Sequence, residues 1–391
     1  MSRLLSGLVL GPLLVALVVG CAQTVPSAAP GAPPARAGRP AGAAAAPAAA
    51  SGAPTEARLE YFTGKTLTVL VNFTAGGPTD IFARMVAQYL DRHVPGNPTV
   101  VVENKPGAGG VIGANYLYNV ARKDGLTLGI FSSPFAAQVI QGEGVQYDSA
   151  EFLWVGGVSE SQVTYARTSL GIKTPRDLLS PSQEMIVGGL SADSAKDLRM
   201  RTFLNLLGAK YRYVTGYPGQ ADVVLAFRRG EVNVGDDSLT SWITNVVPLV
   251  KEGEAAPIAQ QGIVKNGRVV RDPRVADIPT YFEIVEQLKG DAATQTVDYR
   301  AMSALIELGS VLRALVYPPG TDPVLVQVMR KAVADTFADP EFQAAAEKQL
   351  GFQFEFVPGV AAQSLAEKII QGANEDPEPI EHLRRLAKEG R

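Results

Sequence analysis

Cysteine and histidine are scarce in this chain of 391 residues, which has one cysteine, Cys21, and two histidines, His93 and His382. A single cysteine excludes an internal disulfide and the zinc sites that need several cysteines. The chain after residue 58 has no cysteine nucleophile, and no G-x-S-x-G elbow that would carry a catalytic serine occurs. These absences argue against an enzyme and against a metal centre.

Nucleotide-binding loops are also missing. The sequence has no G-x-x-x-x-G-K-[ST] motif, and Ile112 follows Gly107-x-Gly109 where a dinucleotide fingerprint needs its third glycine. The net charge is −3, and no basic stripe with interleaved aromatic residues occurs, so nucleic-acid binding has little support. We therefore expect neither a cofactor nor a nucleic-acid partner.

The first twenty residues have the pattern of an export signal. Arg3 precedes the apolar run Leu4–Val19, and small residues then lead to Cys21. This order is typical of a bacterial lipoprotein signal, and the run is too short for a comfortable membrane-spanning helix. We expect a signal peptide over residues 1–20 and a lipid on Cys21. The alternative is an ordinary secretion signal with an incidental cysteine.

Residues 21–58 consist almost wholly of alanine, proline, glycine and serine. They offer no large apolar side chains that could nucleate a core, which predicts a disordered tether between the anchor and a folded body. The body begins near Leu59. Hydrophobic residues make up 46% of the chain, which is enough for a core and for more than one lobe.

The body begins with alternating strand-like and helix-like segments. Short β-branched or apolar runs cover residues 66–71, 99–103 and 126–131, and helix-like segments cover residues 81–90 and 111–121. Strands that alternate with helices predict an α/β fold with right-handed parallel crossovers. In open sheets of this kind, ligands bind at the carboxyl ends of the strands.

Two glycine-rich loops fall at those strand ends. One contains Gly76 and Gly77, and the other runs from Gly107 to Gly110. Helix N-termini leave N–H groups unpaired, and glycine lets an anion approach them and permits positive φ. The pair of loops could therefore hold a carboxylate with backbone amides rather than with charged side chains. The alternative is that each loop is only a tight strand-to-helix turn.

Four segments of the body resemble one known family: "FTAGGPTDIFAR", "VVENKPGAGGVIGANYL", "DGLTLGIF" and "YPPGTDPVLVQVMRKAVADTFADPEF". They are similar to the extracytoplasmic solute receptors of tripartite tricarboxylate transporters, the Bug family. The resemblance runs from about Leu67 to the C-terminal helices and is weaker between residues 254 and 303. It implies a two-lobed periplasmic-binding-protein (Venus flytrap) fold, each lobe a mixed, mainly parallel sheet flanked by helices.

The resemblance also divides the body and implies how it binds. Residues 59–164 would begin the first lobe, residues 165–307 would form the second, and residues 308–391 would return to the first and add the C-terminal helices. The lobes would close on a small carboxylate that the glycine loops hold, partly through ordered water. Loops around residues 188–194 and 217–219 would contribute from the second lobe.

The candidate ligand-binding residues share these loops and strand ends. They are Phe73, Thr74, Ala75, Gly76, Gly77, Thr79, Asp80, Gly107, Ala108, Gly109, Gly110, Ser132, Ser133, Gly189, Ser191, Tyr217, Gly219 and Asp236. For two of them a structural role is also open. Asp80 lies in the first turn of a helix, where it could cap free N–H groups or orient a ligand-bound water or amino group. Tyr217 could be a core aromatic residue or reach into the cleft.

The sequence thus predicts a lipid-anchored receptor, in the periplasm or on the cell surface, that is not an enzyme. It would hand a small carboxylate to the membrane permease subunits of a tripartite tricarboxylate-type transporter and act as a monomer. A ligand-sensing receptor for a signalling partner would use the same cleft. An enzyme that reuses the fold is a further alternative, which the missing nucleophile and base disfavour.

The lipoprotein signal gives a first prediction. If Cys21 carries the lipid, the protein fractionates with membranes, and Cys21→Ser releases it or blocks its processing. Membrane fractionation and N-terminal sequencing of the mature protein measure both effects. A wholly soluble wild type whose mature N-terminus lies elsewhere would contradict the prediction.

Overall fold

The computed structural model of the chain describes residues 60–132, 134–140, 144–265 and 268–389. The chain divides into two compact units, residues 1–49 and residues 50–391, and every described residue belongs to the second unit. The predicted signal peptide, the predicted lipid site Cys21, the predicted tether and Ser133 therefore lie outside the described residues.

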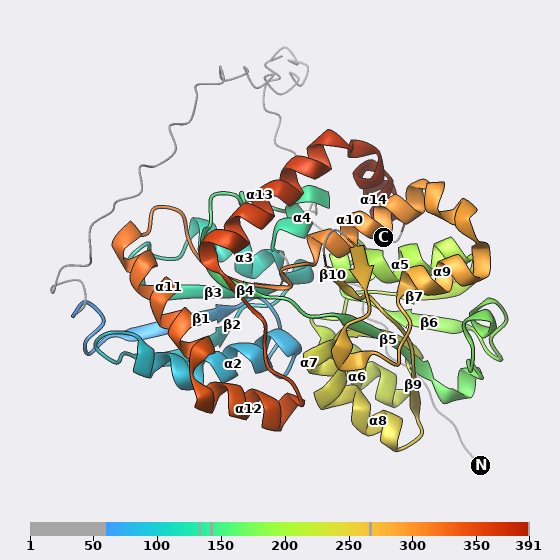
Figure 1. Cartoon of the computed structure of the whole chain (residues 1–391), viewed down its shortest axis with the longest axis horizontal. Coiled ribbons are helices and arrows are strands. Elements are labelled where there is room, and N and C mark those ends of the chain that lie inside the picture. Colours follow the sequence, from blue (N-terminus) through green and yellow to red (C-terminus); the bar gives the residue numbers. More distant parts are fainter. Residues whose placement is uncertain (1–59, 133, 141–143, 266–267, 390–391) are drawn as a thin grey trace, which may run out of the picture. The chain divides into compact units, whose positions relative to one another are not determined.

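The first sheet has the strand order β13-β4-β12-β3-β1-β2 (Figure 1). Its strands are β1 (Thr66–Val71), β2 (Thr99–Asn104), β3 (Thr127–Ser132), β4 (Leu153–Val158), β12 (Arg313–Tyr317) and β13 (Phe356–Pro358). β1 pairs in parallel with β2 and β3, which confirms the three strands expected from the sequence. Val69 and Val71 pack in one core cluster and Leu70 in another, so β1 is buried on both faces.

The second sheet has the strand order β7-β6-β8-β5-β9. Its strands are β5 (Gln162–Arg167), β6 (Met185–Gly188), β7 (Tyr211–Val214), β8 (Val234–Ser238) and β9 (Ala255–Gln260). β6 runs parallel to β7 and β8, whereas β5 runs antiparallel to β8 and β9. In the first sheet β12 is likewise antiparallel to β3 and β4. β13 is also antiparallel to β4, so both sheets are mixed, as expected, but parallel pairing does not predominate in either of them. We call the first sheet with its helices the first lobe and the second sheet with its helices the second lobe.

The chain crosses between the lobes twice, once in each direction. After β4 it crosses over residues 159–161 and enters the second sheet as β5, and after β9 it returns to the first sheet as β12. The predicted boundary after residue 164 falls inside β5, because Gln162 already pairs with Ser238 of β8. The apolar runs of β4 and β5 are separated by only three polar residues, and this short break is where the chain crosses.

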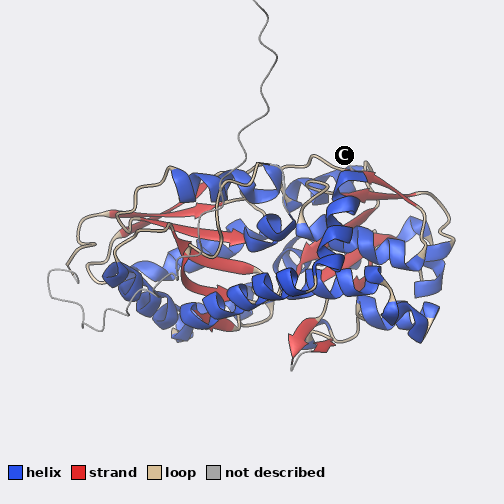
Figure 2. Ribbon diagram, turned by 90° about the horizontal axis from the view of Figure 1, so that it is seen from above, coloured by secondary structure: helices blue, strands red, loops and turns tan. Residues whose placement is uncertain are grey.

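Helices cover the strands of both sheets (Figure 2). The larger ones are α2 (Pro78–Leu90), α3 (Val111–Asn119), α5 (Ala195–Leu207), α6 (Gln220–Arg229), α9 (Tyr281–Lys289), α10 (Val297–Leu308), α11 (Pro323–Ala338), α12 (Pro340–Leu350), α13 (Gly359–Glu375) and α14 (Pro377–Glu389). Shorter elements are α4 (Pro134–Ile140), α7 (Leu239–Ser241), α8 (Val247–Lys251) and the hairpin of β10 (Ile263–Lys265) and β11 (Arg268–Val270). In the described part of the chain, none of the helices combines the length and the apolar character needed to cross a bilayer.

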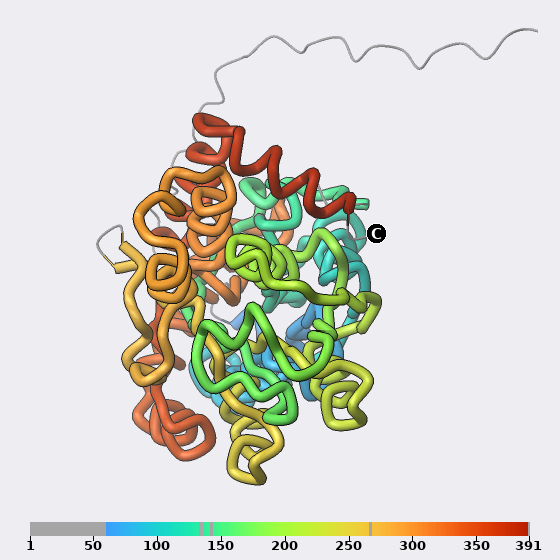
Figure 3. Tube along the Cα trace, turned by 90° about the vertical axis from the view of Figure 1, so that its right-hand side faces the viewer, coloured from blue at the N-terminus to red at the C-terminus, as the bar shows by residue number. Residues whose placement is uncertain are grey.

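The C-terminal helix α14 packs against helices from both lobes. It contacts α4 and α10, and Figure 3 shows the red C-terminal helices against the orange segment that contains α10. It also contacts α5 of the second lobe, where Arg201 donates from Nη2 to the carbonyl of Leu386 at 2.7 Å. Leu386 lies in the last turn of α14, where carbonyls have no partner within the helix, so Arg201 caps that helix end.

A cluster of phenylalanine rings fixes α2 to the C-terminal part of the first lobe. The ring of Phe82 in α2 lies 5.0 Å from that of Phe354 and 6.1 Å from that of Phe337 in α11. Phe337 in turn lies 5.0 Å from Phe342 in α12 and 4.7 Å from Phe356 in β13. The cluster joins segments that are far apart in the sequence.

We predict that Phe82→Ala lowers the free energy of unfolding by about 3–5 kcal/mol, because it leaves a cavity among fully buried rings. Urea unfolding followed by circular dichroism measures the loss. Val360, which is 63% exposed, provides the control, and Val360→Ala should change stability by less than about 0.5 kcal/mol. Equal losses in the two variants would contradict the packing role of the cluster.

Candidate functional site

A cavity of about 60 Å³ lies between the carboxyl-end loops of the two sheets; we call it the interlobe cavity. From the first lobe it is lined by Phe73, Pro78, Thr79, Gly109, Ser132, Ala136, Ala137, Leu312 and Arg313. From the second lobe it is lined by Gln162, Leu190, Ser194, Ala195, Lys196, Arg199, Gln220 and Ser238. Helices α2, α5 and α6 all begin at this cavity, so their positive N-terminal ends converge on it.

Two asparagines at strand ends lock the first-lobe loops. Asn72, directly after β1, accepts from the amide of Ser132 at 3.2 Å and donates to the carbonyl of Gly110 at 3.3 Å. Asn104, at the end of β2, donates to the carbonyl of Phe73 at 2.9 Å and to Oδ1 of Asp80 at 3.0 Å. These bonds hold the ends of β1, β2 and β3 together under the cavity.

Asp80 belongs to this locking network and does not line the cavity. Its Oδ2 accepts from the amide of Gly76 and from Nε of Arg84, both at 2.9 Å, and its carboxylate is buried. Burial alone would raise the pKa of Asp80, but the bonds from Arg84, Gly76 and Asn104 outweigh it and lower that pKa. Asp80 therefore remains an ionised clamp for its own loop.

The second glycine loop has an unusual backbone. Gly107, Ala108, Gly109 and Gly110 have φ values of +125°, +48°, +61° and +97°. Glycine adopts a positive φ without strain. Alanine does not, so the surrounding contacts must hold Ala108 in this conformation. The run brings Gly109 so close to the second lobe that a Cβ there would lie 2.7 Å from Oγ of Ser191.

Most glycine amides of the two loops already have partners within the protein. The amide of Gly76 donates to Asp80, that of Gly77 to the carbonyl of Thr74, and that of Gly110 to the carbonyl of Gly107. Of these loop glycines, only Gly109 is among the residues that line the cavity.

In the second-lobe loop before α5, backbone amides likewise donate to a side chain of the protein. Oδ2 of Asp197 accepts from the amides of Leu190 at 2.6 Å and Ser191 at 2.9 Å, and from Oγ of Ser194 at 2.7 Å. The carboxylate of Asp197 thus takes the place at this helix end that a ligand anion could have used. Oγ of Ser191 is buried and has no hydrogen-bond partner among the described residues.

A contact between the lobes explains why residue 219 is a glycine. Oγ1 of Thr74 donates to Oδ2 of Asp222 in α6 at 3.1 Å. A Cβ on Gly219 would lie 2.2 Å from Oγ1 of Thr74, so only glycine permits this approach. At position 189, an added Cβ would lie 2.4 Å from the ring of Tyr213, so Gly189 is needed for contact with that ring.

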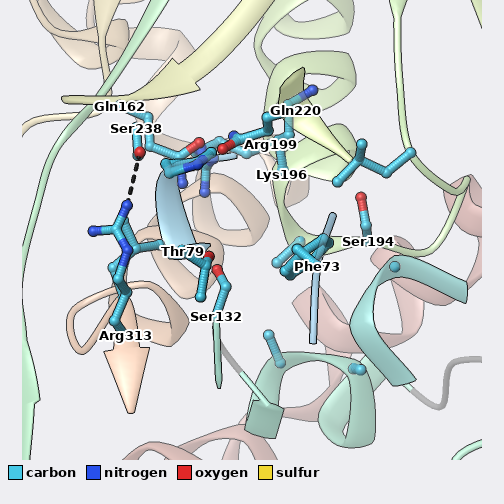
Figure 4. Close-up of a pocket in the computed structure, with 17 residues that line it drawn as sticks. Phe73, Thr79, Ser132, Gln162, Ser194, Lys196, Arg199, Gln220, Ser238 and Arg313 are labelled. Atoms are coloured by element: carbon cyan, nitrogen blue, oxygen red, sulfur yellow. Dashed lines mark hydrogen bonds between the residues drawn. The ribbon is translucent and has the colours of Figure 1, made fainter. Parts of the chain in front are cut away.

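Three cations in the cavity wall were not found from the sequence. Nζ of Lys196 lies 3.1 Å from Oδ1 of Asp197, and Nη2 of Arg199 lies 3.2 Å from Oδ2 of Asp236. Arg313 donates to Glu160 and, at 3.0 Å, to Oγ of Ser238. Figure 4 shows the three cations, with the bond from Arg313 to Ser238 dashed. Of the described residues, no aspartate or glutamate lines the cavity, because the carboxylates stand behind the cations.

The sequence contains signals that point to these cations, although the carboxylates they pair with lie far away along the chain. Lys196 and Arg199 are three residues apart in α5, so they share a helix face next to a glycine–serine loop. Arg313 is the one charged residue in the otherwise apolar strand β12.

Two neighbouring aspartates at the end of β8 lie on opposite sides of that strand. Asp236 accepts from Oγ1 of Thr164 at 2.9 Å and from the hydroxyl of Tyr281 at 2.8 Å, besides its bond with Arg199. Asp237 accepts from the hydroxyl of Tyr165 at 2.7 Å, and its Oδ1 has no partner among the described residues. Neither aspartate lines the cavity.

The structure brings four of the predicted site residues to the cavity wall: Phe73, Thr79, Gly109 and Ser132. The other predicted residues that the structure describes lie outside the cavity lining. They are Thr74, Ala75, Gly76, Gly77, Asp80, Gly107, Ala108, Gly110, Gly189, Ser191, Tyr217, Gly219 and Asp236. Tyr217 is half-buried, and its amide donates to the carbonyl of Gly189 at 3.3 Å.

Unmatched polar atoms in the wall indicate a polar occupant. Nε of Arg199, Nε of Arg313 and Oε1 of Gln162 are buried in residues that line the cavity and have no partner among the described residues. Buried polar groups are nearly always hydrogen-bonded in native proteins, so these atoms favour a ligand or water that bonds to them. Within the described ranges, no cluster of histidine, aspartate and glutamate is placed to hold a metal ion.

Comparison with known proteins gives concordant matches. Residues 82–380 match the model of the tripartite tricarboxylate transporter family receptor. The chain is 27% identical over 302 residues to the "UPF0065 protein in gbd 5'region" of Cupriavidus necator, which covers 75% of this chain and 81% of that protein.

Two solved structures show the same fold. The periplasmic binding protein BugD gives a TM-score of 0.64 at 21% identity, covering 83% of this chain and 98% of its own. MatC from Rhodopseudomonas palustris with bound malate gives a TM-score of 0.61 at 21% identity. This match covers 83% of this chain and 100% of the MatC chain. The expected two-lobed periplasmic-binding-protein fold is therefore confirmed.

The buried Asp237 gives a prediction on pH. Burial raises the pKa of Asp237 to about 7, against the lowering effects of Lys196 and the Tyr165 hydroxyl. A carboxyl whose pKa is raised on folding stabilises the protein fully below its unfolded pKa of about 4, and this stabilisation is lost as the pH rises through about 7. Asp237→Asn, which resembles the protonated form, should therefore be more stable than wild type at pH 8 and similar to it at pH 4.

Thermal melting between pH 4 and pH 8 measures the difference. Asp335, which is half-buried and paired with the exposed Lys331, provides the control, and Asp335→Asn should follow the wild-type profile. An Asp237→Asn profile parallel to that of wild type would contradict the raised pKa.

Proposed function

Because the chain belongs to the tripartite tricarboxylate transporter receptor family, we propose that it captures a small carboxylate in the interlobe cavity and delivers it to the membrane subunits of such a transporter. The observation that carries the proposal is the charge of the cavity wall. Lys196, Arg199 and Arg313 line it, and no acidic side chain among the described residues does. Such a wall favours an anion.

The arrangement of the lobes supports capture between them. Loops from both sheets meet at the cavity, and Thr74 of the first lobe already bonds to Asp222 of the second lobe. A ligand that contacts both lobes stabilises the closed arrangement, and opening about the two crossings of the chain would release it. MatC, which shares the fold, was solved with malate, a small carboxylate of the class that we propose here.

The proposal extends to the surroundings of the receptor. The protein would act outside the cytoplasm, in the periplasm or on the cell surface, anchored through a lipid on Cys21. It would work as a monomer that binds its ligand without turnover. The sequence pattern of the first twenty-one residues supports the anchor, and the missing nucleophile supports binding without chemistry.

A thermal-shift screen over small carboxylates tests the proposal. A ligand that binds only the native state adds about 2.7 kcal/mol of stability at a hundredfold excess over its dissociation constant. Gly109→Val should abolish the shift, because its Cβ would lie 2.7 Å from Oγ of Ser191 and its φ is +61°. Lys105→Ala should keep the shift, because Lys105 lies 3.8 Å from Glu103 and over the ring of Tyr116, outside the cavity lining.

The variants are compared only after circular dichroism shows that they fold. The absence of a shift in wild type with every mono-, di- and tricarboxylate in the screen would contradict the proposed function.

A further inference from the structure

One buried acceptor in the wall of the interlobe cavity lacks a donor. Gln162 lines the cavity and is only 3% exposed, and its Oε1 has no hydrogen-bond partner among the described residues. A buried polar atom without a partner is costly, so a group in the cavity is expected to donate to it. A carboxylate cannot do so, because its oxygens only accept. The ligand must therefore carry a donor besides its carboxylate.

The position of Gln162 follows from the pairing of β5 with β8. Gln162 begins β5 and lies opposite Ser238, at the end of β8. Side chains alternate along a strand, so Gln162 lies on the same face of the sheet as Thr164, whose Oγ1 donates to Asp236. The carbonyl of Gln162 accepts from the amide of Gln261 at 2.8 Å, which fixes the backbone beneath the side chain. The fold thus holds this amide at the edge of the sheet that borders the cavity.

Ser238 adds a donor next to this acceptor. It is buried, lines the cavity and lies beside Gln162 in Figure 4. Its Oγ accepts from Arg313 at 3.0 Å, which uses a lone pair and leaves the hydroxyl hydrogen for another acceptor. Opposite residues on antiparallel strands have Cβ atoms about 4.5–5.5 Å apart, so one ligand group can reach both side chains.

A hydroxyl group matches this pair, whereas an ammonium group does not. A hydroxyl donates one hydrogen and accepts at its oxygen. An ammonium group could also donate to Oε1, but Lys196, Arg199 and Arg313 line the same cavity, and no carboxylate among the described residues does. Like charges repel more strongly in a buried site than in water, so this wall disfavours a further cation. The wall therefore favours an uncharged donor.

Building on the proposed function, we propose that the ligand is a small hydroxy acid and that Gln162 binds its hydroxyl group. The hydroxyl donates to Oε1 of Gln162 and accepts from Oγ of Ser238. An acid without a hydroxyl leaves Oε1 unpaired, and an amino acid places its ammonium group among cations. Gln162 thus determines specificity at the carbon chain of the ligand, whichever groups of the two lobes hold its carboxylate.

The test compares acids that differ in one substituent. Isothermal titration calorimetry gives the dissociation constants of glycolate, acetate and glycine, and of malate, succinate and aspartate, with the tighter-binding enantiomer of malate and of aspartate. Within each set, the ratio of the constant of the unsubstituted acid to that of the hydroxy acid measures the contribution of the hydroxyl group. In wild type this ratio should be at least about tenfold, because a site built to bond a hydroxyl rejects the analogue that lacks it. The amino acid should bind most weakly of the three.

Gln162→Leu should bring this ratio to within about twofold of one, because leucine offers no acceptor. Gln261 provides the matched control. It is a buried glutamine directly after the neighbouring strand β9, its Oε1 also has no partner among the described residues, and it does not line the cavity. Gln261→Leu should leave the ratio within about twofold of wild type, since a purely structural change acts on all three acids alike.

Gln162→Glu provides a second, independent change, because it keeps an acceptor and adds a negative charge. It should weaken the binding of every acid but keep the preference for the hydroxy acid over the unsubstituted one. It should also improve the binding of the amino acid relative to the unsubstituted acid, because the ammonium group gains a counter-charge.

Thermal melting checks that the variants fold. Equal affinities of wild type for the hydroxy and the unsubstituted acids overturn the inference and leave the proposed function intact, and so does a ratio that Gln162→Leu leaves unchanged. If Gln162→Leu fails to fold, the wild-type ratios and the relative gain of the amino acid in Gln162→Glu decide. Failure of wild type to bind any of the six acids counts against the proposed function, and the inference falls with it.

Discussion

A buried ion pair at the crossing between the lobes is the interaction on which the rest of the structure depends. Glu160 lies in the three-residue crossover from β4 to β5, and Arg313 begins the returning strand β12; both side chains are almost fully buried. Glu160 also accepts from the amide of Thr240 at 3.1 Å, and Arg313 donates to Ser238. Removing either partner alone would leave an uncompensated buried charge, which typically costs about 3–5 kcal/mol. The pair thereby joins the first crossover to the start of β12 at the floor of the interlobe cavity.

The loops above this floor are held by side chains that do not line the cavity. Asn72, Asn104, Asp80 and Asp197 bond to loop amides and carbonyls and so make the cavity rigid before anything enters it. A site that is rigid before binding loses less entropy when a ligand enters it. In the cavity wall, Nε of Arg199, Nε of Arg313 and Oε1 of Gln162 remain without a hydrogen-bond partner among the described residues.

Two glycines also determine how closely the lobes approach each other. Gly109 lies against Ser191, and Gly219 against Thr74, and in both places a Cβ would push the lobes apart. Their absence of a side chain permits close contact between the lobes. The glycine loops therefore act on closure as well as on the shape of the cavity.

The sequence by itself determined the alternation of β1, α2, β2, α3 and β3, because apolar periodicity and turn residues are local signals. It also indicated the family through the two glycine loops, and it named Phe73, Thr79, Gly109 and Ser132, which line the interlobe cavity. Only the tertiary structure decided which amides are free and which cations face the cavity. Arg199 meets Asp236, and Arg313 meets Glu160, across 37 and 153 residues of sequence. Such pairings depend on the order of the strands in the sheets and on where the chain crosses between them, and no local pattern carries that information.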